Sequence, residues 1–252
     1  MEIAVVAHGK GEHGNGDRHD TDRGNGDRHD TDRGGDDKRD TDRGGGDGHD
    51  EDHDTACFCA GTMIRMPQGE VAVETLRRGD LVCTQDGRVV PVDWLGIQTV
   101  STIFADKLRV LPIRIKAGAL GENVPARDLL VSPDHAILVE GALIQAGALI
   151  NGTSIVRESN VPTRFTYYHV EVDDHSLILA ENTPAETFVD NVDRLGFDNW
   201  AEHQALYPEG KSISELPYPR AKSHRQVPVA IRVRLGERAQ LIGAVIDGAA
   251  VA

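Results

Sequence analysis

Three short stretches of the sequence carry side chains that can do covalent chemistry. The first is "CFCAGT", which begins at Cys57, the second is "SPDH", with Ser132 and His135, and the third is "YYHVEVDDH", with His169 and His175. A cysteine supplies a thiolate nucleophile near neutral pH. A histidine titrates at about pH 6.5 and can move protons, and a hydroxyl group can stabilise developing negative charge. Together these residue types suit nucleophilic attack on a carbonyl group.

The segments that carry these residues are predicted to be strands. From Cys57 onward the chain consists of short segments rich in β-branched residues, which often alternate between apolar and polar positions. The turn signals between them are "PQG" at 67–69, "QDG" at 85–87 and "EG" at 140–141, where glycine reaches positive φ at low cost. Many short strands with close turns predict a compact all-β domain that is closed or curled to hide its edges.

Few segments favour helix. Residues 72–80 could form a single turn, and residues 184–204 are the best candidate for one or two short helices. Residues 228–237, "PVAIRVRLGE", alternate as a strand does. The small apolar residues that follow at 239–252 match no element.

The three reactive stretches together resemble the Hedgehog/intein (Hint) family, in its bacterial form with a single Hint module and a short C-terminal extension. The family opens with a nucleophilic Cys, an aromatic residue and a Gly-Thr or Gly-Ser turn, and its later motifs are a hydroxyl residue with His three positions on and a strand followed by His. The matching residues, in chain order, are Cys57, Phe58, Gly61, Thr62, Ser132, His135 and the stretch 168–175. Segments 72–87 and 141–155 also have counterparts in the family. The resemblance covers residues 57–195 and implies a horseshoe-like, pseudo-two-fold β fold.

The resemblance implies that the substrate is the protein's own Ala56–Cys57 peptide bond. Cys57 would attack the preceding carbonyl group, His135 would donate a proton to the leaving nitrogen, and Ser132 would orient His135 or the bond. His169 and His175 are candidates for activating the thiol or, later, a water molecule. The resulting thioester would pass to water or to another nucleophile, which the sequence does not identify, and the N-terminal segment would be released.

The sequence departs from splicing inteins at one decisive position. Inteins end in His-Asn because the Asn side chain cyclises to cut the C-terminal junction, whereas here Glu181 precedes Asn182 and Thr183 follows. We therefore expect cleavage rather than splicing. No sterol-binding region like that of Hedgehog proteins is recognisable, so no lipid transfer is expected.

The remaining candidate residues have simpler interpretations. Cys83, between Val82 and Thr84, is expected to pack in the core. Cys59 is either an inert turn residue or the partner of Cys57 in a disulfide. Asp134 either tunes the pKa of His135 or caps a turn.

Residues 1–56 have a different composition from the rest of the chain. Residues 14–53 are four decapeptides such as "GNGDRHDTDR", with no apolar position to build a core. Seventeen acidic residues face eight basic ones in residues 1–56, so this segment holds −9 of the chain's net charge of −14. We expect it to be disordered without a ligand. Its Asp and His side chains could bind Ca²⁺ weakly, and a Zn²⁺ site could form from His49, His53, Cys57 and Cys59.

These features divide the chain into a disordered segment 1–56, a Hint domain 57–195 and a C-terminal extension 196–252. The net charge argues against nucleic acid as a partner, and no apolar run is long enough to span a bilayer. The start "MEIAVVAHGKG" lacks the features of a cleaved secretory signal, which leaves export by another route open. Two alternatives to self-processing are a non-catalytic, secreted cation-binding module and a zinc protein. Self-processing would require no resident cofactor.

Overall fold

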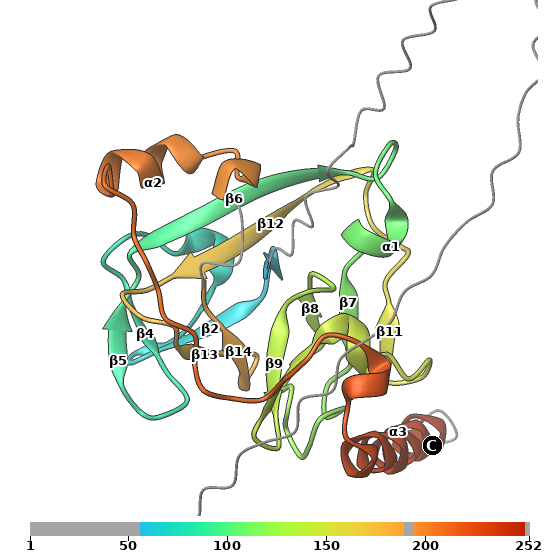
Figure 1. Ribbon diagram of the computed structural model, residues 1–252. Coiled ribbons are helices and arrows are strands. Elements are labelled where there is room, and N and C mark those ends of the chain that lie inside the picture. Colours follow the sequence, from blue (N-terminus) through green and yellow to red (C-terminus); the bar gives the residue numbers. More distant parts are fainter. Residues whose placement is uncertain (1–55, 189–193, 250–252) are drawn as a thin grey trace, which may run out of the picture. The chain divides into compact units, whose positions relative to one another are not determined.

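The computed structural model describes residues 56–188 and 194–249, and all structural statements concern these residues. Figure 1 shows strands curving around a common core, with the helices at the periphery. The predictions for the decapeptide segment, including disorder and cation binding, lie outside the described residues. The predicted all-β class is confirmed, because strands build the part of the chain that the family resemblance covers.

One sheet brings the reactive stretches together. Its six strands are antiparallel and follow the order β11-β7-β8-β1-β12-β6. They span Ile155–Arg157 (β11), Ile113–Ile115 (β7), Leu129–Val131 (β8), Phe58–Cys59 (β1), Arg164–Glu171 (β12) and Trp94–Ser101 (β6). Phe58 pairs with Val131 on one side and with Tyr168 on the other. This register places Cys57 between the residues that follow β8 and those near the end of β12.

A second sheet has seven strands in the order β15-β10-β9-β14-β13-β2-β3. They span Arg220–Ala221 (β15), Ala142–Gln145 (β10), Ala136–Val139 (β9), Thr183–Glu186 (β14), Leu177–Ala180 (β13), Met63–Met66 (β2) and Gly69–Ala72 (β3). All neighbouring strands are antiparallel except β10 and β15. A separate hairpin joins β4 (Leu81–Cys83) to β5 (Val89–Pro91).

The predicted turns connect neighbouring strands. Gly87 has φ +85° in the β4–β5 connection, and Gly141 has φ +78° between β9 and β10. A residue with a Cβ atom adopts these left-handed angles only with strain, so glycine there makes short hairpins possible. Gly69, with φ +140°, closes the "PQG" turn between β2 and β3. The turn signals in the sequence are therefore confirmed.

The core has two main apolar clusters on opposite sides of β1. Phe58 belongs to the larger cluster, which the two sheets share. Cys57 belongs to the smaller one, and Cys59 packs against it. This division follows from strand geometry, because successive side chains point to opposite faces. Cys83 is half-buried, and its neighbour Val82 lies in the core instead, which differs from the core position predicted for Cys83.

The described helices and helical turns are short except for one. They are α1 (Lys107–Val110), α2 (Trp200–Leu206), α3 (Val229–Ala249) and the 3₁₀ turns η1 (Val73–Thr75), η2 (Ala146–Leu149), η3 (Arg194–Gly196) and η4 (His224–Gln226). The turn predicted within 72–80 is confirmed by η1. The helix predicted over 184–204 is right only for its later part, because Pro184–Glu186 belong to β14.

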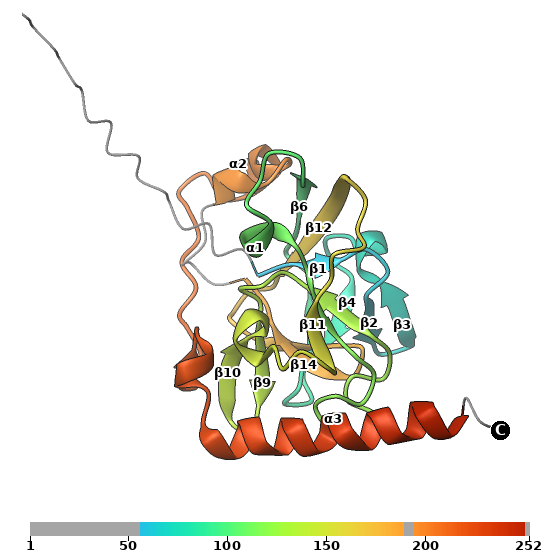
Figure 2. The ribbon, with the colours of Figure 1, turned by 90° about the vertical axis from the view of Figure 1, so that its right-hand side faces the viewer.

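The strand predicted over 228–237 is wrong, because these residues begin α3. Ile231 and Leu235 are buried and Ile242 packs against the same cluster, so the apolar residues that contact the core have helical spacing. The guanidinium group of Arg238 donates to the carbonyl oxygens of Gly118 at 2.6 Å and Gly121 at 3.1 Å. Figure 2 shows α3 lying along one edge of the β domain. No helix in the described ranges is long and apolar enough to cross a bilayer.

Candidate active site

The "SPDH" stretch forms a tight turn between β8 and β9. The His135 N–H donates to the Ser132 carbonyl oxygen at 3.2 Å, with Pro133 at the second position, which suits a β-turn. The Gly147 N–H holds the turn from outside by donating to the Pro133 carbonyl oxygen at 2.8 Å. Ser132 and His135 are both buried. The turn therefore presents a hydroxyl group and an imidazole from a fixed backbone.

Cys57 is hydrogen-bonded to this turn through its backbone. Its N–H donates to Ser132 Oγ at 2.9 Å, and its carbonyl oxygen accepts from the Ser132 N–H at 2.8 Å. The first of these groups is the amide nitrogen of the Ala56–Cys57 bond. Ser132 thus contacts the nitrogen that would leave if this bond were cut.

His135 is fully buried, with its ring 4.3 Å from that of Phe58. Its Nε2 lies 3.1 Å from the Glu186 carbonyl oxygen, which can only accept, so Nε2 carries a proton. Nδ1 has no hydrogen-bond partner among the described residues. Burial lowers the pKa of His135, although the Glu186 carboxylate and the backbone of Cys57 oppose this. His135 is therefore a neutral imidazole with a lone pair available on Nδ1.

His169 contacts the other side of the same peptide bond. Its Nδ1 is hydrogen-bonded to the Ala56 carbonyl oxygen. Its ring meets Phe188 edge-on at 4.8 Å and Phe197 at 5.5 Å. Burial in this apolar setting lowers the pKa of His169 to about 3, even though the Ala56 contact acts in the opposite direction. Because a carbonyl oxygen accepts, this neutral ring is protonated on Nδ1 and donates to Ala56.

The thiol of Cys57 lies in an apolar environment. Its cluster includes Trp94, Tyr167 and Phe188, and burial, with the neighbouring Cys59 adding to it, raises the pKa of Cys57 well above its usual value. Burial also raises the pKa of Cys59, to about 12. All three cysteines are free thiols in the described chain, so the predicted alternative of a Cys57–Cys59 disulfide is not formed.

No group of metal-ligating side chains occurs among the residues that the structure describes. His49 and His53, the other members of the predicted zinc site, lie outside them.

The "AGT" part of the first motif forms the turn that ends β1. Gly61 has φ +84°, and its N–H donates to the Glu74 carboxylate at 2.8 Å. The Thr62 hydroxyl donates to the Cys59 carbonyl oxygen at 2.8 Å. These contacts fix where β1 ends and so fix the backbone on which Cys57 and Cys59 lie.

His175 lies in a different environment from the other two histidines. Its Nδ1 accepts from the Leu216 N–H at 2.9 Å, and its Nε2 lies 3.4 Å from a Glu186 carboxylate oxygen. Neither of these two polar contacts involves Cys57. Leu216 belongs to the predicted C-terminal extension, so His175 links that extension to the β domain.

Glu186 is a residue of the site that the sequence analysis missed. Its carbonyl oxygen contacts His135, one carboxylate oxygen accepts from the Ala136 N–H at 3.0 Å, and the other pairs with Arg220 at 2.7 Å. Burial would raise the pKa of this carboxyl group, but the bond with His175 and the charge of Arg220 hold it below its usual value. Glu186 is therefore a buried carboxylate that joins both histidines to the extension.

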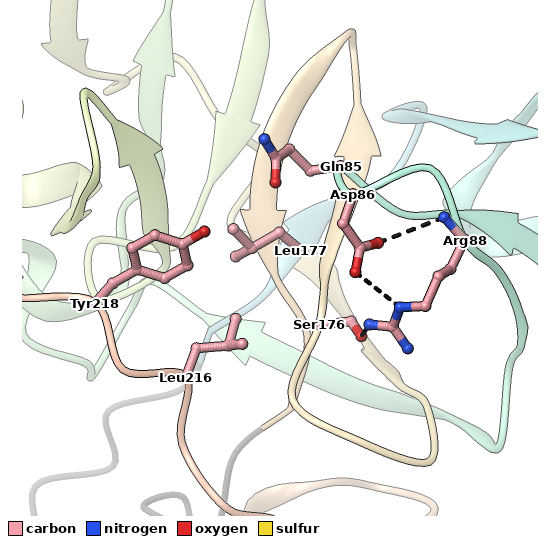
Figure 3. Close-up of a pocket in the computed structure, with 7 residues that line it drawn as sticks. All are labelled: Gln85, Asp86, Arg88, Ser176, Leu177, Leu216 and Tyr218. Carbon is pink, nitrogen blue, oxygen red and sulfur yellow. Dashed lines mark hydrogen bonds and ion pairs between the residues drawn. The ribbon is translucent and has the colours of Figure 1, made fainter.

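A small cavity lies beside Ser176, the residue that follows His175 in the chain (Figure 3). It has a volume of about 60 Å³ and is lined by Gln85, Asp86, Arg88, Ser176, Leu177, Leu216 and Tyr218. The guanidinium group of Arg88 is already paired with Asp86 at 2.8 Å and with Asp174 at 2.9 Å. Because Arg88 is already paired on two sides, this small cavity offers no unpaired charge from Arg88 to a ligand.

The geometry defines an all-β domain that begins at a buried cysteine, with a Ser-His turn on one side of its first peptide bond and a histidine on the other. The family model of the Hint domain matches residues 56–192, which is more than half of the chain. The chain belongs to the Hint domain family, and the resemblance stated from its motifs is confirmed.

Two solved structures illustrate what the chain is similar to. The bacterial intein-like domain from Clostridium thermocellum is 17% identical, and the match covers 53% of this chain and 99% of that domain with a TM-score of 0.39. The DnaB intein from Synechocystis sp. PCC 6803 is 12% identical, over 54% of this chain and 100% of the intein, with a TM-score of 0.36. No curated protein matches the chain.

Proposed function

We propose that this Hint domain cuts its own chain between Ala56 and Cys57. The observation that carries the proposal is the double contact on that peptide bond: His169 Nδ1 at the Ala56 oxygen and Ser132 Oγ at the Cys57 nitrogen. A structural histidine or serine would not need to meet opposite ends of the one bond that precedes the nucleophile. In this proposal residues 1–56 are the segment released, residues 57–195 form the catalytic domain, and residues 196–252 support it.

The first step is an N-to-S acyl shift. The Cys57 sulfur attacks the Ala56 carbonyl carbon, a C–S bond forms, the C–N bond breaks, and the amide nitrogen becomes the free amine of Cys57. The proton lost by the thiol must reach that nitrogen. His135 suits this transfer, because its Nδ1 has a free lone pair and its ring lies close enough to the Cys57 backbone to be influenced by it.

His169 is proposed as a donor to the oxyanion rather than as a base. Negative charge develops on the Ala56 oxygen when the thiol adds, and the Nδ1–H of His169 already faces this oxygen. A histidine whose pKa is about 3 stays neutral at physiological pH, so it holds this proton without competing for the one on the thiol.

Ser132 is proposed to hold the leaving nitrogen in line. By accepting the Cys57 N–H, its hydroxyl fixes the orientation of the amide plane relative to the imidazole of His135. Water or another nucleophile then resolves the thioester and releases residues 1–56.

The proposal is limited to cleavage. Asn182 lies in the connection between β13 and β14, and its side-chain amide donates to the Asn123 carbonyl oxygen at 2.9 Å. An Asn held in this way suits a structural turn better than cyclisation. His175 stays a predicted catalytic residue, and its contact with Glu186 favours an indirect role through His135.

The test is the intact mass of the full chain after incubation with and without dithiothreitol, beside Cys57→Ala. We expect a fragment beginning at Cys57 that appears faster with the thiol and is absent from the variant. An uncut wild-type chain, or equal cutting of the variant, would contradict the proposal.

A further inference from the structure

A thioester on Cys57 would form where water does not reach. The side chain of Cys57 has 0% exposure and packs in the apolar cluster with Trp94, Tyr167 and Phe188. Release of the N-terminal segment requires a nucleophile to meet the acyl carbon. The buried position protects the intermediate, but it also slows its resolution.

Cys59 lies on the same side of the chain as Cys57, at the wall of an open cavity. Side chains two residues apart in an extended strand share a face, with their Cα atoms about 6–7 Å apart. Both cysteines contribute to one apolar cluster, and Phe58 between them contributes to the other. The cavity has a volume of about 290 Å³, and its walls include Cys59, Ala60, Leu130 and Phe165 but not Cys57.

This cavity is large enough for a small nucleophile. Its volume admits several water molecules or a small thiol, since a water molecule occupies about 30 Å³ in the liquid. Arg114 and Glu158 line it as an ion pair of 2.7 Å, so its charges are balanced and neither sign of ligand is favoured. Of the two cysteines near the junction, only Cys59 lines this cavity.

We propose that the acyl group passes from Cys57 to Cys59 before it is released. This inference rests on the proposed cleavage at Cys57. The Cys59 sulfur attacks the Ala56 carbonyl carbon of the thioester, a new C–S bond forms, and the bond to the Cys57 sulfur breaks. The Cys59 thiol proton ends on the Cys57 sulfur. One thioester and one thiol are consumed and one of each is formed, so no oxidant or further reactant is needed.

The relay accounts for two features at once. It gives the second cysteine of "CFC" a chemical use, and it explains how a fully buried acyl-enzyme meets water. The product thioester lies at the cavity wall, where water or a thiol attacks it and releases residues 1–56.

The test compares the full-length wild type with Cys59→Ala, Cys59→Ser and Cys83→Ala. Cys83 is the matched control because it is also half-buried and lies on β4, away from the junction. Two quantities are measured for each chain by mass spectrometry. One is the rate of release of residues 1–56 under native conditions, and the other is the fraction of chain that hydroxylamine cuts between Ala56 and Cys57 in concentrated guanidinium chloride at mildly acidic pH, counted apart from any cutting at the Asn-Gly bonds of the chain. The denaturant exposes every thioester, buried or not.

We expect both Cys59 variants to release the segment about tenfold more slowly or worse, with the hydroxylamine-sensitive fraction equal to or above that of wild type. Cys83→Ala should match wild type in both. Native release at the wild-type rate from either Cys59 variant would overturn the relay. So would loss of the hydroxylamine-sensitive fraction in Cys59→Ser, which preserves the size of the side chain, because Cys59 would then be needed before the thioester forms. A wild-type chain that releases no residues 1–56 and is not cut at the junction by hydroxylamine would instead show that the proposed cleavage itself fails.

Discussion

Acid should destabilise the uncut domain through His169. The pKa of this imidazole is about 3 in the folded chain against 6.5 for a free histidine, because the folded chain buries it between Phe188 and Phe197. Well above pH 6.5 the ring is neutral in both the folded and the unfolded states and contributes no pH dependence. As the pH falls below 6.5, the unfolded state takes up a proton that the folded state does not, so stability is lost down to a pH of about 3.

The size of this effect follows from the shift. One pKa unit corresponds to about 1.36 kcal/mol. The interval between 6.5 and about 3 therefore predicts that roughly 5 kcal/mol of unfolding free energy is lost across this range through His169. His135, whose pKa burial also lowers, acts in the same direction. A variant at position 169 alone is needed to separate the two.

The assay is urea unfolding at a series of pH values from 7 to 3, followed by tryptophan fluorescence. Both chains carry Cys57→Ala to prevent cutting, and one also carries His169→Gln. We expect the free energy of unfolding to fall more steeply in the chain that retains His169, with the two curves diverging below pH 6.5. Curves that stay parallel over the whole range would refute the view that His169 is neutral and desolvated at the junction.

Three further predictions concern single side chains. Ser132→Ala on a Cys57→Ala background removes the acceptor of a buried N–H and should cost about 1–3 kcal/mol in urea unfolding, with Ser132→Thr recovering most of it. Glu186→Gln should move the acid limb of the cleavage pH profile to lower pH, because the carboxylate raises the pKa of His135 and the neutral imidazole is the active form; an unmoved limb would argue against their coupling. Leu235→Ala on the buried face of α3 should cost about 2–5 kcal/mol, whereas Val233→Ala on its exposed face should change stability by about 0.5 kcal/mol or less.

The sequence predicted the fold class and the motif residues because both have local signals. Cys57, Ser132 and His135 stand in short motifs with fixed spacing, and glycines at the hairpin turns mark where strands end. The pairing of β1 with β8 and β12 then brings together residues that lie 75 and 113 positions apart, through the bonds of Cys57 to Ser132 and of Ala56 to His169.

The C-terminal helix was beyond prediction because its pattern fits two periods. Residues 229, 231, 233 and 235 are all apolar, as in a strand, but only Ile231 and Leu235 are buried. The choice between a strand and a helix is made by the surface on which the segment packs. That surface is built by other parts of the chain, so the residues of the segment alone do not reveal it.

Glu186 was missed for a related reason. Its partners His135 and Arg220 are 51 and 34 positions away, and a Glu at the end of a short strand has no distinguishing neighbour in the sequence. Glu186 could have been noticed as a charged residue at the end of a mostly buried strand. A buried carboxylate requires partners, which would have marked it as part of a polar network. The proposed role of His169 as a donor likewise depends on the tautomer that its contact with Ala56 selects.

The central claim is that Ala56 becomes a thioester, and its most direct test is the mass of the small fragment. The full-length chain is incubated with an excess of 2-mercaptoethanesulfonate, and the released fragment is measured before hydrolysis is complete. The account predicts a fragment of residues 1–56 whose C-terminal Ala56 carries the thiol as a thioester, together with a large fragment whose N-terminal residue is Cys57. A small fragment found only as the free acid from the earliest times, or one that ends at another residue, would contradict it.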